Sequence, residues 1–230
     1  LEPFLEKIIQ HLDKDNGSFK GAPKFPQFYL FDAMFYFHLK TGKEEYFKPV
    51  ETLLYNISSK GMYDHLAGGI ARYTVDENWI IPHFEKMLYD NIQYIGLLNK
   101  FFQKTNNLYY KKKLEQTINF INSEFKNDFG LYGSAYDADS DGVEGKYYVW
   151  NYLELKNTLG PKFNLFAKKY ILKEEGNFEG NNILIENKSH LSDEETKEIS
   201  NIEKKLLDQR KERAKPLFDD KSQTDQNCFL

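Results

Sequence analysis

The chain has 230 residues, enough for one large domain, or part of one, with a sizeable hydrophobic core. Its net charge of −4 provides no basic surface for nucleic acid or an anionic membrane. One cysteine, Cys228, excludes an internal disulfide framework or a CxxC site, and no apolar run approaches the roughly 18 residues of a membrane-spanning helix. With no signal peptide at its start, we expect a cytoplasmic protein.

Apolar residues recur at helical spacing along most of the chain. They predict helices over residues 1–12, 27–40, 43–59, 82–104, 108–125, 151–159, 161–170 and 192–213. The last of these is highly charged with a thin apolar stripe, so we expect it on the outside. Residues 146–150 have the aromatic and β-branched composition of a short strand, and residues 182–186 are predicted to be extended.

Long loops and short turns alternate between these helices, whereas a plain helical bundle has short loops throughout. The alternation indicates an all-α fold, a partial α/α toroid in which the long loops gather at one end and build a site. We assign residues 1–214 to this partial barrel, with short β-hairpins inserted in its long loops. Residues 215–230 are predicted to be an irregular tail.

The first long loop and the start of the next helix read GMYDHLAGGIARYTVDENWIIPHFEKMLYDN, residues 61–91. Loops longer than about 12–15 residues are usually functional or disordered, and this one is too aromatic for disorder. A helix starting at Pro82 would place His83, Lys86, Asp90 and Gln93 on one polar face. The alternative is a solvated face with a Lys86–Asp90 pair.

Acids, bases and aromatic rings concentrate in this loop and in residues 134–150, and such groups serve proton transfer when burial moves their pKa toward neutrality. The candidate catalytic residues are His83, Glu85, Asp90, Asp137 and Asp139. The candidate substrate-binding residues are Asp64, His65, Arg72, Tyr73, Tyr136 and Trp150. Glycoside cleavage by two carboxylates, proton transfer next to a carbonyl, and a purely structural role all remain open.

The DADSDG run begins like a calcium-binding EF-hand loop, but Tyr148 stands where the bidentate Glu would be. A solvated acidic turn or a set of pocket carboxylates remains. No GxxxxGK[ST] or GxSxG pattern is present, and Cys228 has no nearby His. We therefore expect no metal, no cofactor and no Ser or Cys nucleophile.

Five segments together resemble the successive motifs of one family. They are GAPKFP (21–26), GGIARYTVDENWIIPHFEKMLYDN (68–91), SAYDADSDGVEGKYYVW (134–150), GNFEGNNIL (176–184) and RAKPLFDDK (213–221). In this order they are similar to the YyaL-type proteins, also called spermatogenesis-associated thioredoxin-like proteins. The resemblance implies an (α/α)6 barrel similar to N-acylglucosamine 2-epimerases and six-hairpin glycosidases, here without the thioredoxin-like domain that precedes the barrel in the family.

After residue 221 the resemblance decays, with Gln226 where the family has Trp and Cys228 where it has Gly. The family likeness covers only about the first half of a barrel. We therefore expect either a carbohydrate-related protein with an acid/base pocket that binds a sugar-like small molecule, or a non-catalytic module. The second hypothesis includes self-association, or a partner that supplies the missing barrel or thioredoxin-like segments.

Overall fold

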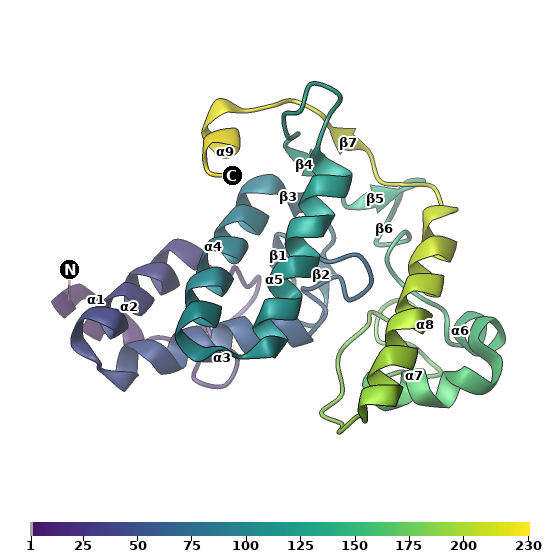
Figure 1. The fold of residues 1–230 in the computed structure, drawn as a ribbon, viewed down its shortest axis with the longest axis horizontal. Helices are drawn as coiled ribbons and strands as arrows, with labels where there is room; N and C mark the ends of the chain where they lie inside the picture. The colour runs from purple at the N-terminus through teal and green to yellow at the C-terminus, as the bar shows by residue number, and fades with distance from the viewer. Residues whose placement is uncertain (1) are drawn as a thin grey trace.

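Antiparallel helical hairpins dominate the first half of the computed structural model, which describes residues 2–230 (Figure 1). After α1 (Glu2–Ile9), the first hairpin consists of α2 (Phe28–Thr41) and α3 (Glu44–Ser59), and the second of α4 (Leu88–Thr105) and α5 (Leu108–Phe120). Gly42 ends α2 in the left-handed region at φ 72°, and its N–H donates to the His38 carbonyl. These helices confirm the predicted ranges closely, α4 excepted.

The second half contains shorter helices and one long one. A π-helical turn (Ile121–Phe125) extends α5, and then follow α6 (Tyr152–Leu159), a 3₁₀ turn (Gly160–Lys162), α7 (Phe163–Lys169) and α8 (Asp193–Lys211). Ser192 and Glu195 form a capping box that starts α8. The predicted apolar stripe of α8 is buried through Ile199, Ile202 and Leu206, so this charged helix packs one face against the core.

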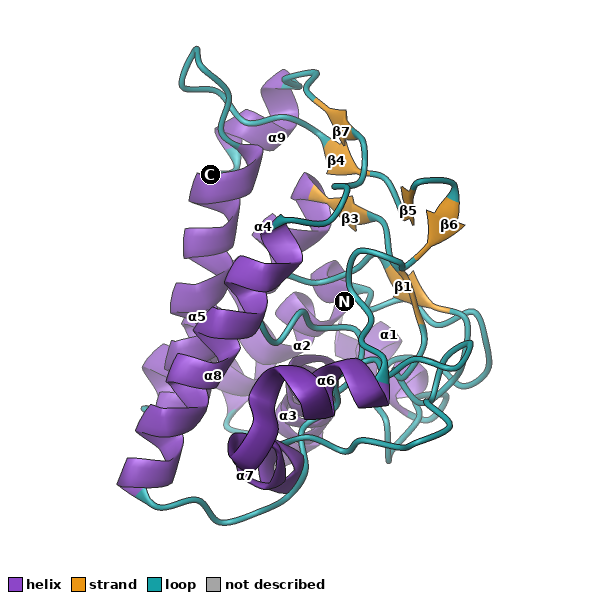
Figure 2. Ribbon diagram, turned by 90° about the vertical axis from the view of Figure 1, so that its right-hand side faces the viewer, coloured by secondary structure: helices purple, strands orange, loops and turns teal. Residues whose placement is uncertain are grey.

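Residues 2–230 contain seven two-residue strands, which lie together on one side of the molecule (Figure 2). They are β1 (Tyr73–Thr74), β2 (Pro82–His83), β3 (Lys86–Met87), β4 (Ala135–Tyr136), β5 (Asp139–Ser140), β6 (Val143–Glu144) and β7 (Phe218–Asp219). β1 pairs with β2, β5 pairs with β6, and β4 lies between β3 and β7, every pair antiparallel. The short hairpins expected in the long loops are therefore present.

Three local predictions were wrong. The fourth helix begins at Leu88 rather than Pro82, because residues 82–83 and 86–87 pair as strands β2 and β3. Residues 146–150 form turns instead of the predicted strand, because the backbone N–H groups of Tyr148 and Val149 donate to the Gly145 carbonyl. Of these residues, only Trp150 forms a β-bridge, to Asn182. The tail is not irregular, since it contributes β7 and the helix α9 (Thr224–Cys228). Leu1, in the predicted first helix, lies outside the described residues.

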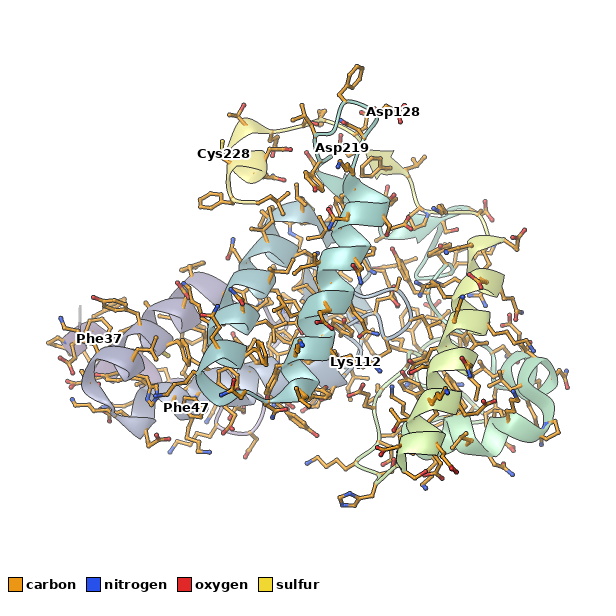
Figure 3. All side chains as sticks on the ribbon, viewed as in Figure 1. Phe37, Phe47, Lys112, Asp128, Asp219 and Cys228 are labelled. Atoms are coloured by element: carbon orange, nitrogen blue, oxygen red, sulfur yellow. The ribbon has the colours of Figure 1, made fainter. Side chains whose placement is uncertain are left out.

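Two apolar clusters make up most of the core. The larger lies among α1 to α5 and includes Trp79, and the smaller lies among α6, α7 and α8 and includes Trp150. Side chains fill the interior densely along the length of the molecule (Figure 3). Helices paired by short turns, with strand-bearing long loops between the pairs, are the architecture of part of an α/α toroid, as the sequence predicted.

Candidate functional site

Strands β1 and β2 bring together an arginine, a histidine and a glutamate from the first long loop. The Arg72 guanidinium donates to Glu85 Oε2 at 3.0 Å, and the Arg72 backbone N–H donates to the Glu85 carbonyl at 2.9 Å. His83 Nδ1 lies 2.7 Å from Glu144 Oε1, and His83 Nε2 lies 4.0 Å from Glu85 Oε2. Since a carboxylate only accepts hydrogen bonds, Nδ1 carries the hydrogen and Nε2 of a neutral His83 is left as a base.

Asp90, in the first turn of α4, lies within range of the charges of Arg72 and Glu85. Its side chain is almost fully buried, and Oδ2 has no hydrogen-bond partner among the described residues. Burial raises the pKa of Asp90 to about 7; the Glu85 charge adds to this and the Arg72 charge opposes it. The carboxyl can therefore hold or release a proton near neutral pH. We call Arg72, His83, Glu85 and Asp90 the Asp90 cluster.

Tyr73 supports the cluster. Its ring stacks on His83 at a centroid distance of 4.9 Å, and the Phe25 ring stacks on Tyr73 at 4.7 Å. The register of β1 and β2 places Tyr73 directly opposite His83, which explains the first contact. With these two rings stacked on it, Tyr73 orients His83 and has little open face for a ligand.

Asp64 lies in a separate, fully buried ion cluster. The Arg210 guanidinium donates to both of its carboxylate oxygens, at 2.9 and 2.8 Å, and Lys86 Nζ donates at 2.8 Å. Burial alone would raise the pKa of Asp64, but the charges of Arg210 and Lys86 outweigh it and lower the pKa. This cluster ties α8 to the first long loop and to β3. The Lys86–Asp90 pair of the alternative interpretation, a solvated face, does not form, because Lys86 is paired with Asp64.

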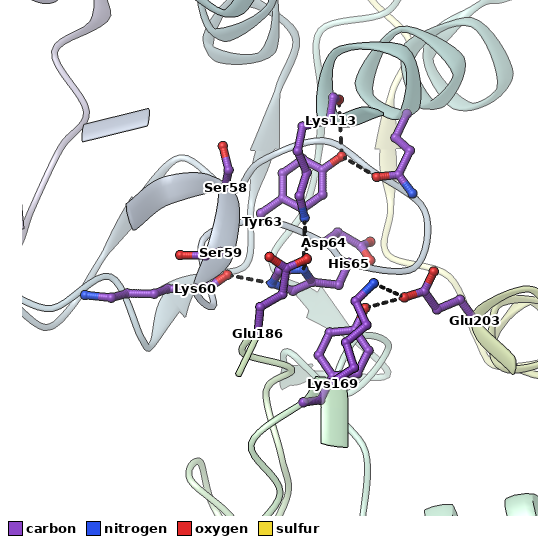
Figure 4. A network of polar contacts seen from close by, with 12 residues as sticks. Ser58, Ser59, Lys60, Tyr63, Asp64, His65, Lys113, Lys169, Glu186 and Glu203 are labelled. Carbon is purple, nitrogen blue, oxygen red and sulfur yellow. Dashed lines mark hydrogen bonds and ion pairs between the residues drawn. The ribbon is translucent and has the colours of Figure 1, made fainter. Parts of the chain in front are cut away.

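His65 belongs to a third group, shown in Figure 4, with Lys113 from α5 and Glu186. His65 Nε2 lies 3.0 Å from the Lys60 carbonyl, so Nε2 carries the hydrogen and Nδ1 accepts from Lys113 Nζ at 3.2 Å. Lys113 also donates to Glu186 at 3.0 Å. Burial lowers the pKa of Lys113 to about 8, against the raising effect of Glu186. His65 is therefore neutral and positioned by its neighbours.

The residues predicted from the second long loop are dispersed. Asp137 is exposed and accepts the backbone N–H of Ala138 at 2.6 Å. The pairing of β5 with β6 places the exposed Asp139 opposite Glu144, the partner of His83. Tyr136 stacks on Phe218 and its hydroxyl donates to the Glu124 carbonyl at 2.8 Å.

Trp150 was predicted to bind substrate, but it is fully buried in the smaller apolar cluster. The Arg213 guanidinium lies 4.0 Å from the centroid of its ring. Trp150 is thus a core residue that presents no open face to a ligand.

Five polar residues were not identified from the sequence as partners of Asp64, His65 and His83. They are Lys86, Lys113, Glu144, Glu186 and Arg210. Lys113, Glu144 and Arg210 stand in stretches rich in charge, where a solvated side chain is the usual expectation. The one local signal is Gly145, at φ 72°, which turns the chain so that Glu144 faces His83 while the Phe84 ring lies against the glycine.

Within residues 2–230, no group of three or more His, Cys, Asp or Glu side chains is arranged to hold a metal ion. No helix in the same range is both long enough and apolar enough to cross a membrane.

Comparisons with known proteins give one set of relatives. No family model matches. Spermatogenesis-associated protein 20 of Homo sapiens is 29% identical over 194 residues, covering 77% of this chain and 25% of that protein. The Mus musculus protein of the same name is 30% identical over 193 residues, covering 75% and 24%. An uncharacterised Caenorhabditis elegans protein is 30% identical over 200 residues, covering 76% and 27%.

Among solved structures, a sugar epimerase from a ruminal bacterium matches 59% of this chain and 37% of its own, at 16% identity and a TM-score of 0.47. The chain spans about a quarter of the length of the curated relatives that it matches. Matched over three quarters of its own length, the chain belongs to the spermatogenesis-associated protein 20 family.

Proposed function

We propose that the Asp90 cluster transfers protons to and from a small polyhydroxy molecule, with a sugar as the first class to test. The observation that carries the proposal is the Asp90 carboxyl, which is buried, lacks a partner on Oδ2 among the described residues and has a pKa of about 7. A group that titrates near the working pH is the most effective proton donor or acceptor. The sequence motifs support a sugar, because they resemble a barrel family similar to sugar epimerases.

The roles within the cluster follow from charge and tautomer. His83 Nε2 is the base that takes a proton from a carbon next to a carbonyl group, and Glu144 on Nδ1 stabilises the imidazolium that forms. Asp90, in its protonated form, donates to the carbonyl oxygen or to the opposite face of the carbon. Arg72, 41% exposed and anchored by Glu85, stabilises the negative oxygen that develops. Delivery of a proton to the neighbouring carbon completes an isomerisation, and delivery from Asp90 to the opposite face of the same carbon completes an epimerisation; neither needs an oxidant or reductant. Proton exchange with water then restores neutral His83 and protonated Asp90.

Deuterium exchange tests this proposal whatever product the reaction forms. Reducing sugars and 2-acetamido sugars are incubated with the protein in D2O, and proton NMR follows the signal of the carbon-bound hydrogen next to the carbonyl. We expect at least one sugar to exchange, and Asp90→Asn and His83→Gln to stop the exchange. Glu77→Gln, an exposed change in the same loop, is the matched control that retains it.

Exchange that survives both cluster substitutions would place the chemistry elsewhere. No exchange with any sugar, together with a loss of stability in both variants, would favour a second candidate, a non-catalytic module held together by its polar groups. Asp64 and His65 favour that alternative, since the side chains of both are buried and hydrogen-bonded to neighbouring residues.

A further inference from the structure

A cavity of about 430 Å³ lies beside the His65 group, between α3, α5, α7 and the segment 186–191. It is well within the size range of small-molecule sites. Because α4 and α5 are antiparallel, this cavity, near the start of α5, is at the other end of the hairpin from Asp90 at the start of α4. The cavity is thus separate from the Asp90 cluster.

Four lysines line this cavity, namely Lys112, Lys113, Lys169 and Lys188. Glu186 is the one carboxylate among its described lining residues, and it already accepts from Lys113 at 3.0 Å and from the Tyr109 hydroxyl at 2.8 Å. Lys169 is paired with Glu203, which does not line the cavity. Glu186 and Glu203 are therefore already paired with Lys113 and Lys169.

Lys112 and Lys188 are exposed, and within residues 2–230 neither forms an ion pair. Lys112 is labelled in Figure 3, near the N-terminal end of α5. Lys188 Nζ lies 5.5 Å from the ring of Tyr55, which also lines the cavity. Tyr55 and Tyr109 pack against each other at a centroid distance of 6.4 Å, so an aromatic wall adjoins these two exposed lysines.

We propose that this cavity binds a phosphate monoester with a flat apolar or aromatic body. Lys112 and Lys188 contact the phosphate dianion, since lysines without a carboxylate partner are free to bind phosphate oxygens. Tyr55 and Tyr109 contact the body of the ligand. Lys113 is held by His65 and Glu186 and lies 5.4 Å from the centroid of the Tyr109 ring, so it adds positive charge beside the aromatic side chains.

Calorimetry with phenyl phosphate at low salt tests the proposal, with benzyl alcohol, benzoate and inorganic phosphate as comparison ligands. We expect phenyl phosphate to bind most tightly of the four. Lys112→Gln and Lys188→Gln should each weaken it by about 10-fold, the value of one charge-assisted contact. Lys111→Gln is the matched control, because Lys111 neighbours Lys112 in sequence but pairs with Glu115 and does not line the cavity.

Several outcomes would overturn the proposal. Binding weakened equally by Lys111→Gln would show attraction to general positive charge. If benzoate bound as tightly as phenyl phosphate, the site would not be specific for a dianion. If inorganic phosphate bound as tightly as phenyl phosphate, Tyr55 and Tyr109 would not contribute to binding. Asp90→Asn should leave phenyl phosphate binding unchanged, so failure of the sugar hypothesis and failure of this one are distinguishable.

Discussion

Two aspartates show how partners decide the behaviour of a buried carboxyl. Asp64 and Asp90 are both nearly inaccessible to water. Asp64 has Arg210 and Lys86 in contact, which overcome the effect of burial and lower its pKa. Asp90 has no such contact on Oδ2 among the described residues, and burial raises its pKa to about 7. The first residue is a structural anion, whereas the second is suited to proton transfer.

The raised pKa of Asp90 predicts a dependence of stability on pH. The folded carboxyl keeps its proton up to about pH 7, whereas the unfolded one, with an ordinary value of 3.8, has lost it. This contribution to stability is complete below the unfolded value and is lost as pH rises through about 7. Asp90→Asn cannot titrate, so relative to wild type it should gain on the order of 2–3 kcal/mol between about pH 5 and about pH 8.

Urea unfolding of wild type and Asp90→Asn at both pH values measures this difference. Glu77→Gln, an exposed change nearby, should keep the wild-type pH dependence. Parallel pH profiles for wild type and Asp90→Asn would contradict a carboxyl that stays protonated in the folded state.

How far the sequence predicts a site depends on how close its residues are along the chain. Arg72, His83, Glu85 and Asp90 lie close together in the sequence. In the structure Glu85 contacts Arg72 and lies 4.0 Å from His83, and the charges of Arg72 and Glu85 act on the pKa of Asp90. Asp64 and His65 come from the same loop, but their side chains belong to two different buried groups. Their partners Arg210 and Glu186 are more than a hundred residues away, and no local pattern indicates such pairings.

At the scale of elements, helices with a clear apolar stripe were predicted well, whereas the short hairpins were expected in the long loops but the positions of their strands were not predicted. The segment 82–87 begins with a Pro and leads directly into helical spacing, so it reads locally as a first helical turn. In the structure it forms β2 and β3, because Tyr73 and Tyr136 supply the opposite strands. Strand pairing of this kind depends on contacts across the fold, which the local sequence does not contain.

The Asp64 cluster attaches α8 to the rest of the fold, and two substitutions separate its contributions. Asp64→Asn leaves Lys86 and Arg210 buried without an anion, so we predict a loss of about 3–5 kcal/mol in the free energy of unfolding. Arg210→Met keeps the Lys86–Asp64 pair and fills the space of the side chain, so we predict a smaller loss, about 1–3 kcal/mol.

Urea unfolding followed by circular dichroism measures both values. Lys204→Gln, an exposed change on α8, is the control and should stay within about 0.5 kcal/mol of wild type. A larger loss in Arg210→Met than in Asp64→Asn would show that packing of α8, rather than charge neutralisation, is what the cluster supplies.

At the scale of the whole molecule, two apolar clusters are joined through buried polar contacts. Asp64 with Arg210 links the first long loop to α8, and Lys113 with Glu186 links α5 to the segment after α7. Buried charges of this kind are costly when separated. The two clusters should therefore unfold together rather than as independent parts.

The two tryptophans report on this directly, because Trp79 lies in the larger cluster and Trp150 in the smaller. In Trp79→Phe and Trp150→Phe, the fluorescence of the remaining tryptophan and the circular dichroism of the helices should give the same urea midpoint. If the Trp150 signal changed at a lower urea concentration than the helical signal, the smaller cluster would be an independent unit.

The proposal for the Asp90 cluster depends most directly on the protonation of one carboxyl group. Carbon-13 NMR of protein labelled at the aspartate carboxyl carbons follows this group through a pH titration, and Asp90→Asn identifies its resonance. We predict a midpoint near the value of about 7 set by burial. The midpoint should rise in Arg72→Gln, because the positive charge of Arg72 lowers the pKa of Asp90. A midpoint at the ordinary value of about 4 would contradict a role for Asp90 as a proton donor.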